Sequence, residues 1–345
     1  MPKPIVLHLG DDIRWNHGLY QELQQSFDIV RSYSMKRPEF IEALKSKKFG
    51  DFNAIYRPFW NTGGEMGPFN DELISLLPSS CKIYASAGAG FDWVDTVRLA
   101  KNNIIYCNSA DACTESAADA ALYLILNTFR RFTQSALAAR SLDPEQFRVA
   151  TSSIPAMTHN PAGHVLGVIG MGRIGLRVAQ KAYAAFGMKI LYYDVVRKPS
   201  KLEEEIKATF VNTLDELLAM SDCTLLATPY VGDILVKREH FLKMKEGSRF
   251  VNIARGKLVD EDGLIAALES NHLFAAGLDV HFDEPHVNPK LAHMINVEVQ
   301  CHIGGGSLES HMGFEKLGME NIMSFFKTGQ PISPVNMHLI DQSKL

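Results

Sequence analysis

The sequence lacks both an excess of basic residues and any long apolar run. Its net charge of −4 leaves no basic footprint of the kind that nucleic-acid-binding proteins carry. No apolar run approaches the roughly 20 residues that span a bilayer. The stretch from Met1 to Pro4 enters the strand-like run Ile5–Leu9 without the apolar core of a signal peptide. We therefore expect neither a nucleic-acid partner nor a membrane partner.

Cysteine is scarce and scattered. The five cysteines include no C-x-x-C pair and show no spacing of metal ligands. An odd, unclustered set is typical of reduced thiols inside a cell. We therefore expect no structural zinc site and no other metal.

The chain is long and apolar enough for more than one domain, and strand-like and helix-like segments alternate along it. Its 345 residues favour about two domains, and 46% hydrophobic residues are ample for two cores. Short apolar runs alternate with helix-like segments, which predicts parallel sheets covered by helices on both faces. The predicted fold class is α/β, with two doubly wound parallel-sheet domains.

One stretch, His164 to Gly175, organises the second domain. Val165–Ile169 is a short β-branched apolar run, which is typical of a strand buried on both faces. Gly170, Gly172 and Gly175 then give G-x-G-x-x-G, and the apolar residues that follow recur at helical spacing. Alone, the motif would also fit an ordinary glycine turn, but its place between a strand and a helix predicts dinucleotide binding.

Each glycine of this motif has a separate predicted role. Gly170 allows a tight turn, Gly172 lets a pyrophosphate approach the backbone, and Gly175 lets the helix pack close to the strand. The helix N-terminus, with Arg173 and Ile174, offers unpaired N–H groups and a positive dipole end to the phosphates. The whole motif is therefore predicted to hold the cofactor.

An acid at the expected place completes the cofactor motif. Asp194 ends the apolar run Ile190–Tyr193, nineteen residues after Gly175, where a ribose-binding acid belongs. Its carboxylate would accept hydrogen bonds from both ribose hydroxyls and repel a 2′-phosphate, so the sequence favours NAD. Arg197 lies close by in the sequence and leaves NADP as the less favoured cofactor.

The first domain is predicted to have its own parallel sheet without a G-x-G-x-x-G motif. Arg57–Asn70, which contains Phe59 and Trp60, is either a surface loop or a wall of the substrate pocket. The small residues Ala87–Gly90 either form an ordinary turn or offer backbone N–H groups to an anion. The predicted strands are Ile5–Leu9, Asp28–Arg31, Ala54–Tyr56, Ile83–Ala85 and Ile104–Cys107.

The rest of the chain predicts an inserted domain. A helix from Thr114 to Arg131 crosses between domains, and the polar, proline-containing residues 132–163 are predicted to be an irregular arm. Another helix, near Leu308–Phe326, returns to the first domain. The substrate-binding domain is then 1–110 plus 307–345, and a Rossmann domain, 111–306, is inserted into it. Its six predicted strands are Val165–Ile169, Lys189–Tyr193, Thr224–Thr228, Arg249–Asn252, Ala275–Asp279 and Val297–Gln300.

Three charged or titratable residues, Arg255, Glu284 and His302, each follow a different strand candidate of the second domain. Ligands bind at the carboxyl ends of strands in open α/β sheets. We therefore expect the three side chains to meet in one cleft, although each alone would more often be an ion pair or a satisfied core group.

At these residues the sequence resembles the D-isomer-specific 2-hydroxyacid dehydrogenases. The resemblance covers nearly the whole chain, and the intervals between Arg255, Glu284 and His302 agree with the family's order. The formate dehydrogenase branch carries Gln in place of Glu284, so that branch is disfavoured. The resemblance implies that the N–H groups of Ala89 and Gly90 hold a substrate carboxylate. It also implies cofactor contacts from Thr228, Pro229, Ile253, Ala254, Asp279, Gly304 and Gly305.

The residue types fit reduction of a small 2-keto acid to the D-2-hydroxy acid, and the reverse reaction. His302 is suited to donate and accept the proton, because imidazole titrates near neutral pH. Glu284 would orient the ring, and Arg255 would bind the substrate carboxylate and polarise the carbonyl. His281 and His286 are interpreted as bystanders, and His311 is a weaker candidate for the cleft.

The family resemblance leaves an alternative and two further expectations. An NADH-sensing corepressor of the same family keeps a similar triad, so the triad does not exclude that function. A homodimer is expected from the resemblance. The final residues Ser343-Lys344-Leu345 match a peroxisomal import signal read by a receptor, which predicts a peroxisomal protein in a eukaryote and a cytoplasmic one otherwise.

Overall fold

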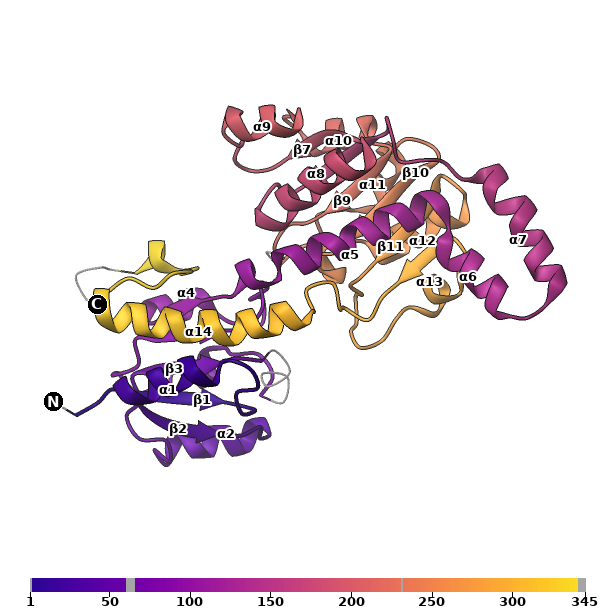
Figure 1. Cartoon of the computed structure of the whole chain (residues 1–345). Helices are drawn as coiled ribbons and strands as arrows, with labels where there is room; N and C mark the ends of the chain where they lie inside the picture. The colour runs from indigo at the N-terminus through magenta and orange to yellow at the C-terminus, as the bar shows by residue number, and fades with distance from the viewer. Residues whose placement is uncertain (1, 60–65, 231, 341–345) are drawn as a thin grey trace. The chain divides into compact units, whose positions relative to one another are not determined.

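The computed structural model describes residues 2–59, 66–230 and 232–340, and it divides into two compact units. Unit 1 comprises residues 1–113 and 306–345, and unit 2 comprises residues 114–305. Both units are built on parallel sheets with helices between the strands (Figure 1). The predicted α/β class and the insertion of one domain into the other are confirmed. Trp60 of the predicted loop and the C-terminal tripeptide lie outside the described residues.

Unit 1 has a five-stranded sheet in the order β2-β1-β3-β4-β5. All its pairs are parallel, so each strand is followed by a crossover that returns to the same edge. Its elements are β1 (Ile5–Leu9), α1 (His17–Ser26), β2 (Asp28–Ser32), α2 (Arg37–Lys45), β3 (Ala54–Arg57), α3 (Asp71–Ile74), β4 (Ile83–Ser86), α4 (Thr96–Lys101), β5 (Ile105–Cys107), α14 (Leu308–Thr328) and η3 (Met337–Leu339).

Helix α14 belongs to unit 1, as predicted. Its apolar face, with Met319 and Ile322, packs in the same core cluster as strand residues of the unit-1 sheet. A Cβ at Gly318 would stand 2.6 Å from the Tyr56 ring, so only glycine permits this approach. The buried Glu315 carboxylate accepts hydrogen bonds from the backbone N–H groups of Arg14 and Asn16 (2.7 and 2.9 Å), which fixes the loop after β1 to this helix.

Unit 2 has a seven-stranded parallel sheet in the order β12-β11-β10-β9-β6-β7-β8. The order reverses between β6 and β9, which is where doubly wound sheets bind their ligands. Helix α5 (Ala110–Arg130) begins in unit 1 and continues into unit 2. The other elements of unit 2 are α6 (Phe132–Arg140), α7 (Pro144–Met157), β6 (Val165–Ile169), α8 (Arg173–Phe186), β7 (Lys189–Tyr193), α9 (Ser200–Ile206), β8 (Thr209–Phe210), α10 (Leu214–Met220), β9 (Cys223–Leu226), α11 (Arg238–Lys243), β10 (Ser248–Asn252), η2 (Gly256–Leu258), α12 (Glu261–Glu269), β11 (Leu273–Leu278), α13 (Pro289–His293) and β12 (Val297–Val299).

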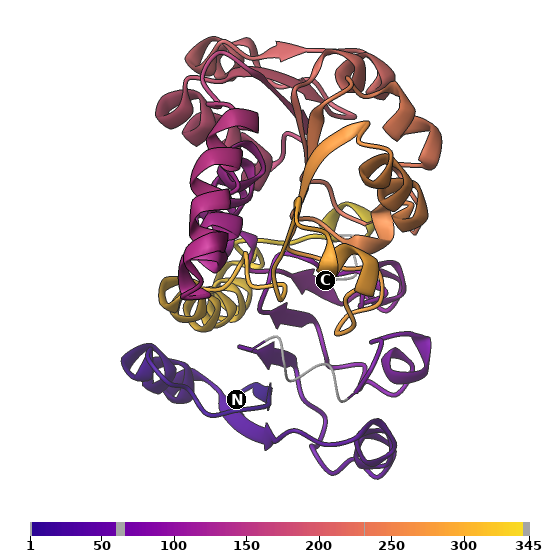
Figure 2. The ribbon, with the colours of Figure 1, turned by 90° about the vertical axis from the view of Figure 1, so that its right-hand side faces the viewer.

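The unit-2 sheet is covered on both faces (Figure 2). Helices α5, α8 and α9 pack on one face through residues such as Phe129 and Val178. Helices α10 to α13 pack on the other face through residues such as Phe241 and Leu264. Two buried layers explain why the strands read as continuous apolar runs rather than as alternating ones. No helix in the described ranges has the length and apolar content of a membrane span.

Two sequence predictions for unit 2 are wrong. Residues 132–163 are not an irregular arm, because they contain helices α6 and α7. Pro144 is the first residue of α7, and the Asp143 side chain caps it by accepting from Glu145 N (2.9 Å), so the proline starts the helix instead of breaking it. The sheet also has a seventh strand, β8, whose two residues are too few to show a period in the sequence.

Candidate active site

The order of the unit-2 sheet brings the predicted site residues to one edge. Strands β6, β9, β10, β11 and β12 are successive neighbours and all parallel, so the loops that follow them line the same edge. The glycine turn follows β6, Arg255 follows β10, Glu284 follows β11 and His302 follows β12. Residues more than a hundred positions apart in sequence therefore belong to one row of loops.

The glycine turn has the geometry that its motif predicts. Gly170 has φ of +93°, and a Cβ there would stand 2.8 Å from the Ala227 carbonyl oxygen. A Cβ at Gly175 would stand 2.0 Å from the Gly170 carbonyl oxygen, so α8 packs directly on the turn. A Cβ at Gly172 would meet nothing within 4 Å, which leaves open space beside the backbone for a pyrophosphate. The residues present therefore fit a dinucleotide.

Helix α8 begins directly after this turn. Gly172 is its N-cap, no side chain caps it, and Arg173 and Ile174 form its first turn. Uncapped N–H groups and the positive end of the helix dipole favour a phosphate at this place. The structure thus places Arg173 and Ile174 in the first turn of α8, and their contact with a phosphate stays a prediction.

The carboxylate of Asp194 lies at the turn, just after β7. Its Oδ2 accepts a hydrogen bond from Met171 N (2.8 Å), which orients the side chain toward the glycine motif. Lys198 Nζ lies 3.3 Å from the same oxygen, a neighbour that sequence reasoning missed. The i,i+4 interval between these residues was the available signal, but no helix was predicted there to give it meaning.

Arg197, the residue that left NADP open, is engaged elsewhere. Its guanidinium donates to both oxygens of Glu203 (2.9 and 2.8 Å). The Tyr192 hydroxyl donates to the same carboxylate (2.6 Å). Hydrogen bonds from Arg197 and then from Tyr192 lower the pKa of Glu203 to about 2, so the ion pair persists through the neutral pH range. The cation near Asp194 in the structure is therefore Lys198.

A buried asparagine shapes the turn that carries Arg255. Asn252 Oδ1 accepts from Ala254 N (2.9 Å), and Asn252 Nδ2 donates to the Arg255 carbonyl (2.9 Å). The Arg255 side chain donates from Nη1 to the Ala254 carbonyl (2.8 Å). Gly256 packs so closely on the next loop that a Cβ there would stand 2.0 Å from the His281 carbonyl carbon. The Arg255 turn thus packs tightly against the loop that carries Glu284.

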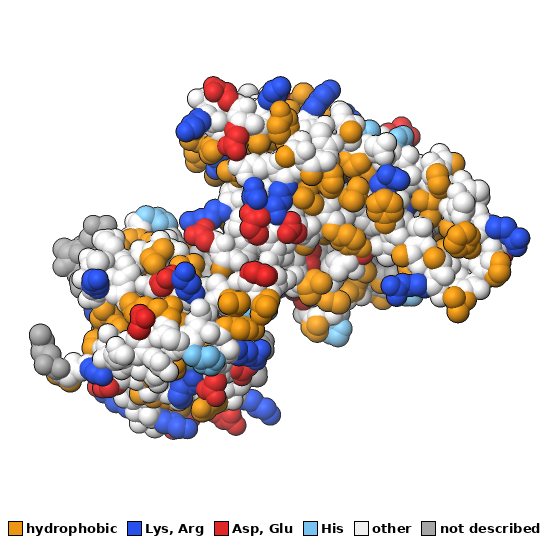
Figure 3. Space-filling view, viewed as in Figure 1, with side chains coloured by type: hydrophobic (Ala, Val, Ile, Leu, Met, Phe, Trp, Pro, Cys, Tyr) orange, Lys and Arg blue, Asp and Glu red, His pale blue; other side chains and the backbone are white. Residues whose placement is uncertain are grey.

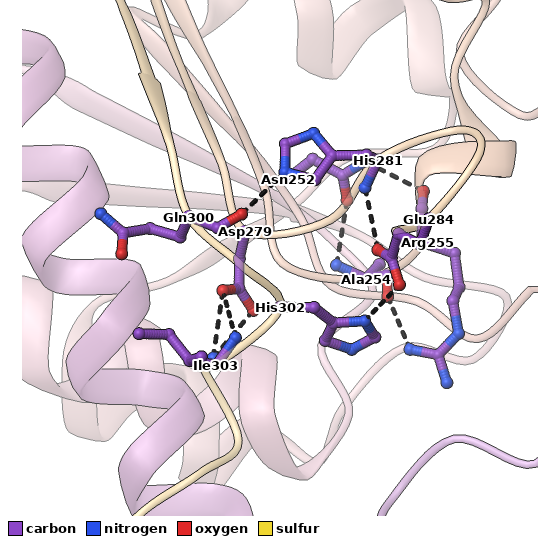
Figure 4. A network of polar contacts seen from close by, with 10 residues as sticks. Asn252, Ala254, Arg255, Asp279, His281, Glu284, Gln300, His302 and Ile303 are labelled. Carbon is purple, nitrogen blue, oxygen red and sulfur yellow. Dashed lines mark hydrogen bonds and ion pairs between the residues drawn. The ribbon is translucent and has the colours of Figure 1, made fainter. Parts of the chain in front are cut away.

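His302 and Glu284 form the pair that the sequence predicted. His302 Nδ1 lies 2.7 Å from Glu284 Oε2, and both side chains are about one-third exposed (Figure 4). A carboxylate accepts only, so Nδ1 carries the hydrogen and Nε2 is left to act on a ligand. Figure 4 also shows the Arg255 side chain on the same side of the loops as this pair. The triad side chains are therefore presented together by unit 2.

The Glu284 carboxylate is held in its charged form. Partial burial raises its pKa, but hydrogen bonds from His302 and from His281 N outweigh that effect, and the pKa lies below the usual value. Oε1 takes the backbone bond (2.9 Å) and Oε2 takes the imidazole bond. Both oxygens are thus engaged, and the negative charge stays beside the imidazole at neutral pH.

Asp279 anchors the loop that presents His302, a role that sequence reasoning missed. Its carboxylate is buried and accepts from Ile303 N (2.9 Å) and Gly304 N (3.0 Å), while its backbone oxygen accepts from His302 N (2.8 Å). His302 itself has φ of +53°, the left-handed conformation. Three consecutive N–H groups bound by one residue explain how this conformation is held.

The remaining predicted contacts fall on the same edge or in unit 1. Gly304 is buried against Asp279, and Gly305 follows it. Ala89 and Gly90 belong to unit 1, directly after β4, where Asn108 Nδ2 donates to the Ala89 carbonyl (2.8 Å). The other predicted cofactor residues occupy the loops after β9 and β10: Thr228, Pro229, Ile253 and Ala254.

One histidine interpreted as a bystander has two contacts in the site. His281 N donates to Glu284, and the His281 ring Nε2 lies 2.7 Å from the Gln300 carbonyl oxygen. His286 is exposed and shares a short backbone bridge with Asp283. In the described parts of the chain, no three His, Cys, Asp or Glu side chains form a group that could hold a metal ion.

Comparison with known proteins identifies the family of this chain. Residues 122–304 match the family model of the NAD-binding domain of D-isomer-specific 2-hydroxyacid dehydrogenases. The holo structure of D-mandelate dehydrogenase from Rhodotorula graminis superposes with a TM-score of 0.94, with 42% identity over 97% of this chain and 98% of the other. A glyoxylate reductase structure from Paecilomyes thermophila gives 0.90, with 32% identity over 98% of this chain and 100% of the other.

A curated relative covers the same span. The 4-methyl-2-oxopentanoate reductase A of Aspergillus oryzae is 34% identical over 96% of this chain and 98% of its own length. The chain therefore belongs to the D-isomer-specific 2-hydroxyacid dehydrogenase family. It is an oxidoreductase with a Rossmann domain for a nicotinamide dinucleotide, as the sequence predicted.

Proposed function

We propose that this protein reduces a small 2-keto acid to the D-2-hydroxy acid with NADH, and catalyses the reverse reaction. The observation that carries the proposal is the 2.7 Å bond between His302 and Glu284, at the edge of the sheet that also carries the glycine turn. An imidazole with one nitrogen bound by a carboxylate presents its other nitrogen as an acid or base.

Each residue of the triad has a distinct proposed role. A nicotinamide cofactor, when bound, would supply or accept the hydride. His302 Nε2 gives a proton to the carbonyl oxygen during reduction and takes it back during oxidation. Glu284 orients the ring and places its negative charge beside it. Arg255 binds the substrate carboxylate with its planar fork and polarises the carbonyl. The contribution of Ala89 and Gly90 to the substrate carboxylate stays a prediction.

The proposal is tested by NADH oxidation, followed at 340 nm, with a panel of 2-keto acids. The panel contains glyoxylate, hydroxypyruvate, benzoylformate and 4-methyl-2-oxopentanoate. We expect the bulky apolar acids to be preferred, because the likeness to the mandelate dehydrogenase and to the methyl-oxopentanoate reductase spans nearly the whole chain. Firm NADH binding without turnover of any 2-keto acid would contradict an enzyme and favour the NADH sensor.

We propose NAD rather than NADP as the cofactor. Asp194 lies where the adenine ribose is expected, and Arg197 is engaged by Glu203 instead of being available for a 2′-phosphate. Lys198, 3.3 Å from Asp194, is the remaining cation, and its charge is neutralised by that carboxylate. The preference is therefore expected to depend on Asp194.

Asp194→Ala is expected to change the ratio of kcat/KM for NADH to that for NADPH by about 10- to 100-fold toward NADPH. Loss of a charged hydrogen-bond partner costs about 1.5–3 kcal/mol, and Lys198 becomes free to meet a 2′-phosphate. Steady-state kinetics with both cofactors measure the ratio. Arg197→Ala serves as the control and should leave it unchanged. An unchanged ratio in Asp194→Ala would show that another group reads the ribose.

We propose that the protein is a homodimer formed through the arm, defined as helices α6 and α7. Helix α6 buries no residue in this chain, and α7 buries Ile154. Apolar side chains gather over the arm in Figure 3. The large exposed ones on the two helices are Phe132, Leu137, Phe147, Val149 and Met157, and Leu142 is exposed in the turn between them. Helices with so little burial are marginal in water, and their exposed apolar side chains are expected to be covered by a second copy.

The double substitution Leu137→Glu with Phe147→Glu is expected to halve the mass in solution. Each places a charge on an exposed apolar position of the arm (64% and 57% exposed). Size-exclusion chromatography with light scattering measures the mass. Leu242→Glu, at a 70% exposed position of α11, is the matched control and should leave the wild-type mass unchanged. A wild-type protein with the mass of one chain would contradict the proposal.

Peroxisomal import through Ser343-Lys344-Leu345 stays a prediction, because these residues lie outside the described part of the chain. A fluorescent protein that carries the last residues of the chain tests it in a eukaryotic cell. Punctate fluorescence that coincides with a peroxisomal marker is expected, and loss of the puncta on removal of the tripeptide should follow. Diffuse fluorescence of the intact fusion would contradict the prediction.

A further inference from the structure

The segment that carries Glu284 is joined to the segment that carries His302 by few contacts. Among the hydrogen bonds between described residues, two connect residues 280–285 with residues 300–304. One is the bond between Glu284 and His302 itself. The other runs from the His281 ring Nε2 to the Gln300 carbonyl oxygen and is 2.7 Å long. Asp279, just before the first segment, binds the backbone N–H groups of residues 302–304, and His281 adds the bond that holds Gln300.

The His281 ring is placed for this task. It is 7% exposed, and a carbonyl oxygen accepts only, so Nε2 carries the hydrogen and donates it. In the described structure the other ring nitrogen, Nδ1, is buried and has no hydrogen-bond partner. Figure 4 shows the ring turned away from Glu284, toward Gln300, while its backbone N faces the Glu284 carboxylate. One residue thus contacts both segments.

The backbone of His281 is fixed from a third side. Gly256, next to Arg255, lies so close that a Cβ there would stand 2.0 Å from the His281 carbonyl carbon and 2.4 Å from Phe282 N. The Arg255 turn therefore packs directly against the backbone at the start of the Glu284 segment. His281 is the point at which the segments of all three triad residues meet.

We propose that His281 is a positioning residue for the triad, acting through its Nε2–H donor on Gln300. This inference rests on the proposed roles of His302 and Glu284. The donor fixes the strand end two residues before His302, and the backbone N of the same residue fixes Glu284. Without the donor, the bond between Glu284 and His302 is the one hydrogen bond left between residues 280–285 and residues 300–304 of the described structure. The bonds of Asp279 to residues 302–304 then anchor the His302 loop but do not hold Gln300 to the Glu284 segment.

A matched pair of substitutions separates the donor from the shape of the side chain. In His281→Gln the amide Nε2 stands in for the ring Nε2, whereas His281→Met has similar length and no donor. We expect His281→Gln to keep kcat within about threefold of the wild type. We expect His281→Met to lower kcat about 10- to 100-fold while KM and the Kd for NADH change little. His281→Asn, whose amide is too short to reach Gln300, replaces the Met variant if that variant does not fold.

A double-mutant cycle with Glu284→Gln distinguishes positioning from a general structural effect. If His281 acts through the Glu284–His302 bond, His281→Met lowers kcat much less in the Glu284→Gln background than in the wild type. Equal losses in both backgrounds, wild-type kcat in His281→Met, or equal losses in the Gln and Met variants would each overturn the inference. Loss of turnover in His302→Asn with wild-type kcat in His281→Met would leave the proposed function intact. Wild-type kcat in His302→Asn would overturn that function itself.

Discussion

Replacement of His302 by alanine is expected to lower kcat for 2-keto acid reduction by about 10²- to 10⁴-fold, the usual contribution of a general acid. NADH binding is expected to stay at its wild-type level, because the glycine turn and Asp194 lie on other loops and keep their contacts. Steady-state kinetics at 340 nm and quenching of NADH fluorescence measure the two quantities separately.

The backbone at His302 decides the choice of a second variant. Its φ of +53° lies in the left-handed region, which asparagine tolerates better than alanine. His302→Asn therefore keeps the loop conformation while it removes the imidazole, and it should lose as much turnover as His302→Ala. His286→Ala, at an exposed histidine close by in sequence, is the control and should keep its kcat. A kcat near the wild-type value in both His302 variants would refute the assignment.

Glu284→Gln is expected to lower kcat about 10- to 100-fold, which corresponds to the roughly 1.5–3 kcal/mol of a hydrogen bond to a charged group. The wild-type carboxylate uses one oxygen for His281 N and the other for His302 Nδ1. Glutamine has a single acceptor oxygen, so one of these two donors loses its partner. The neutral amide also no longer stabilises a charged imidazole.

Glu284→Asp is the matched variant for this prediction. It keeps the negative charge and both acceptor oxygens but shortens the side chain, so its loss of kcat should come from geometry and leave the pH dependence close to that of the wild type. If Glu284→Gln has wild-type kcat, the carboxylate does not orient the imidazole, and the pair in the structure has no catalytic role.

Much of the fold could be predicted because its signals are local. The β6 strand, the three glycines and Asp194 each follow from residue type and spacing, and the glycine contacts match their predicted roles. A Cβ at Gly175 would stand 2.0 Å from a carbonyl oxygen, so the motif has little freedom to be anything else. A buried parallel sheet also gives continuous apolar runs, which mark its strands plainly.

The arm was mispredicted because its two helices bury almost nothing within this chain. Pro144 and Pro155 lie in α7, and the large apolar side chains of both helices are mostly exposed. Because neither helix has a buried face, this segment of the sequence shows little of the apolar periodicity that marks a helix. Asp143 as an N-cap followed by Pro144 is a signal for a helix start. The polar residues and prolines of the segment favoured an irregular structure instead.

The site was predicted as a list of residues but not as a network. Intervals along the chain pointed to Arg255, Glu284 and His302, whereas the contacts of Asp279, Lys198 and His281 are long-range or depend on backbone conformation. The left-handed His302 and the close approach of Gly256 leave no trace in residue spacing. Side chains that position others could therefore be found only in the structure.

The most direct test of a carboxylate-braced imidazole as the proton donor is the pH dependence of kcat/KM for 2-keto acid reduction, compared between the wild type and Glu284→Gln. Reduction needs a proton on the imidazole of His302, and Glu284→Gln removes the negative charge that lies 2.7 Å from Nδ1. We therefore predict that the pH at which kcat/KM has fallen to half its maximum lies lower in Glu284→Gln. The same midpoint in both proteins would contradict the account.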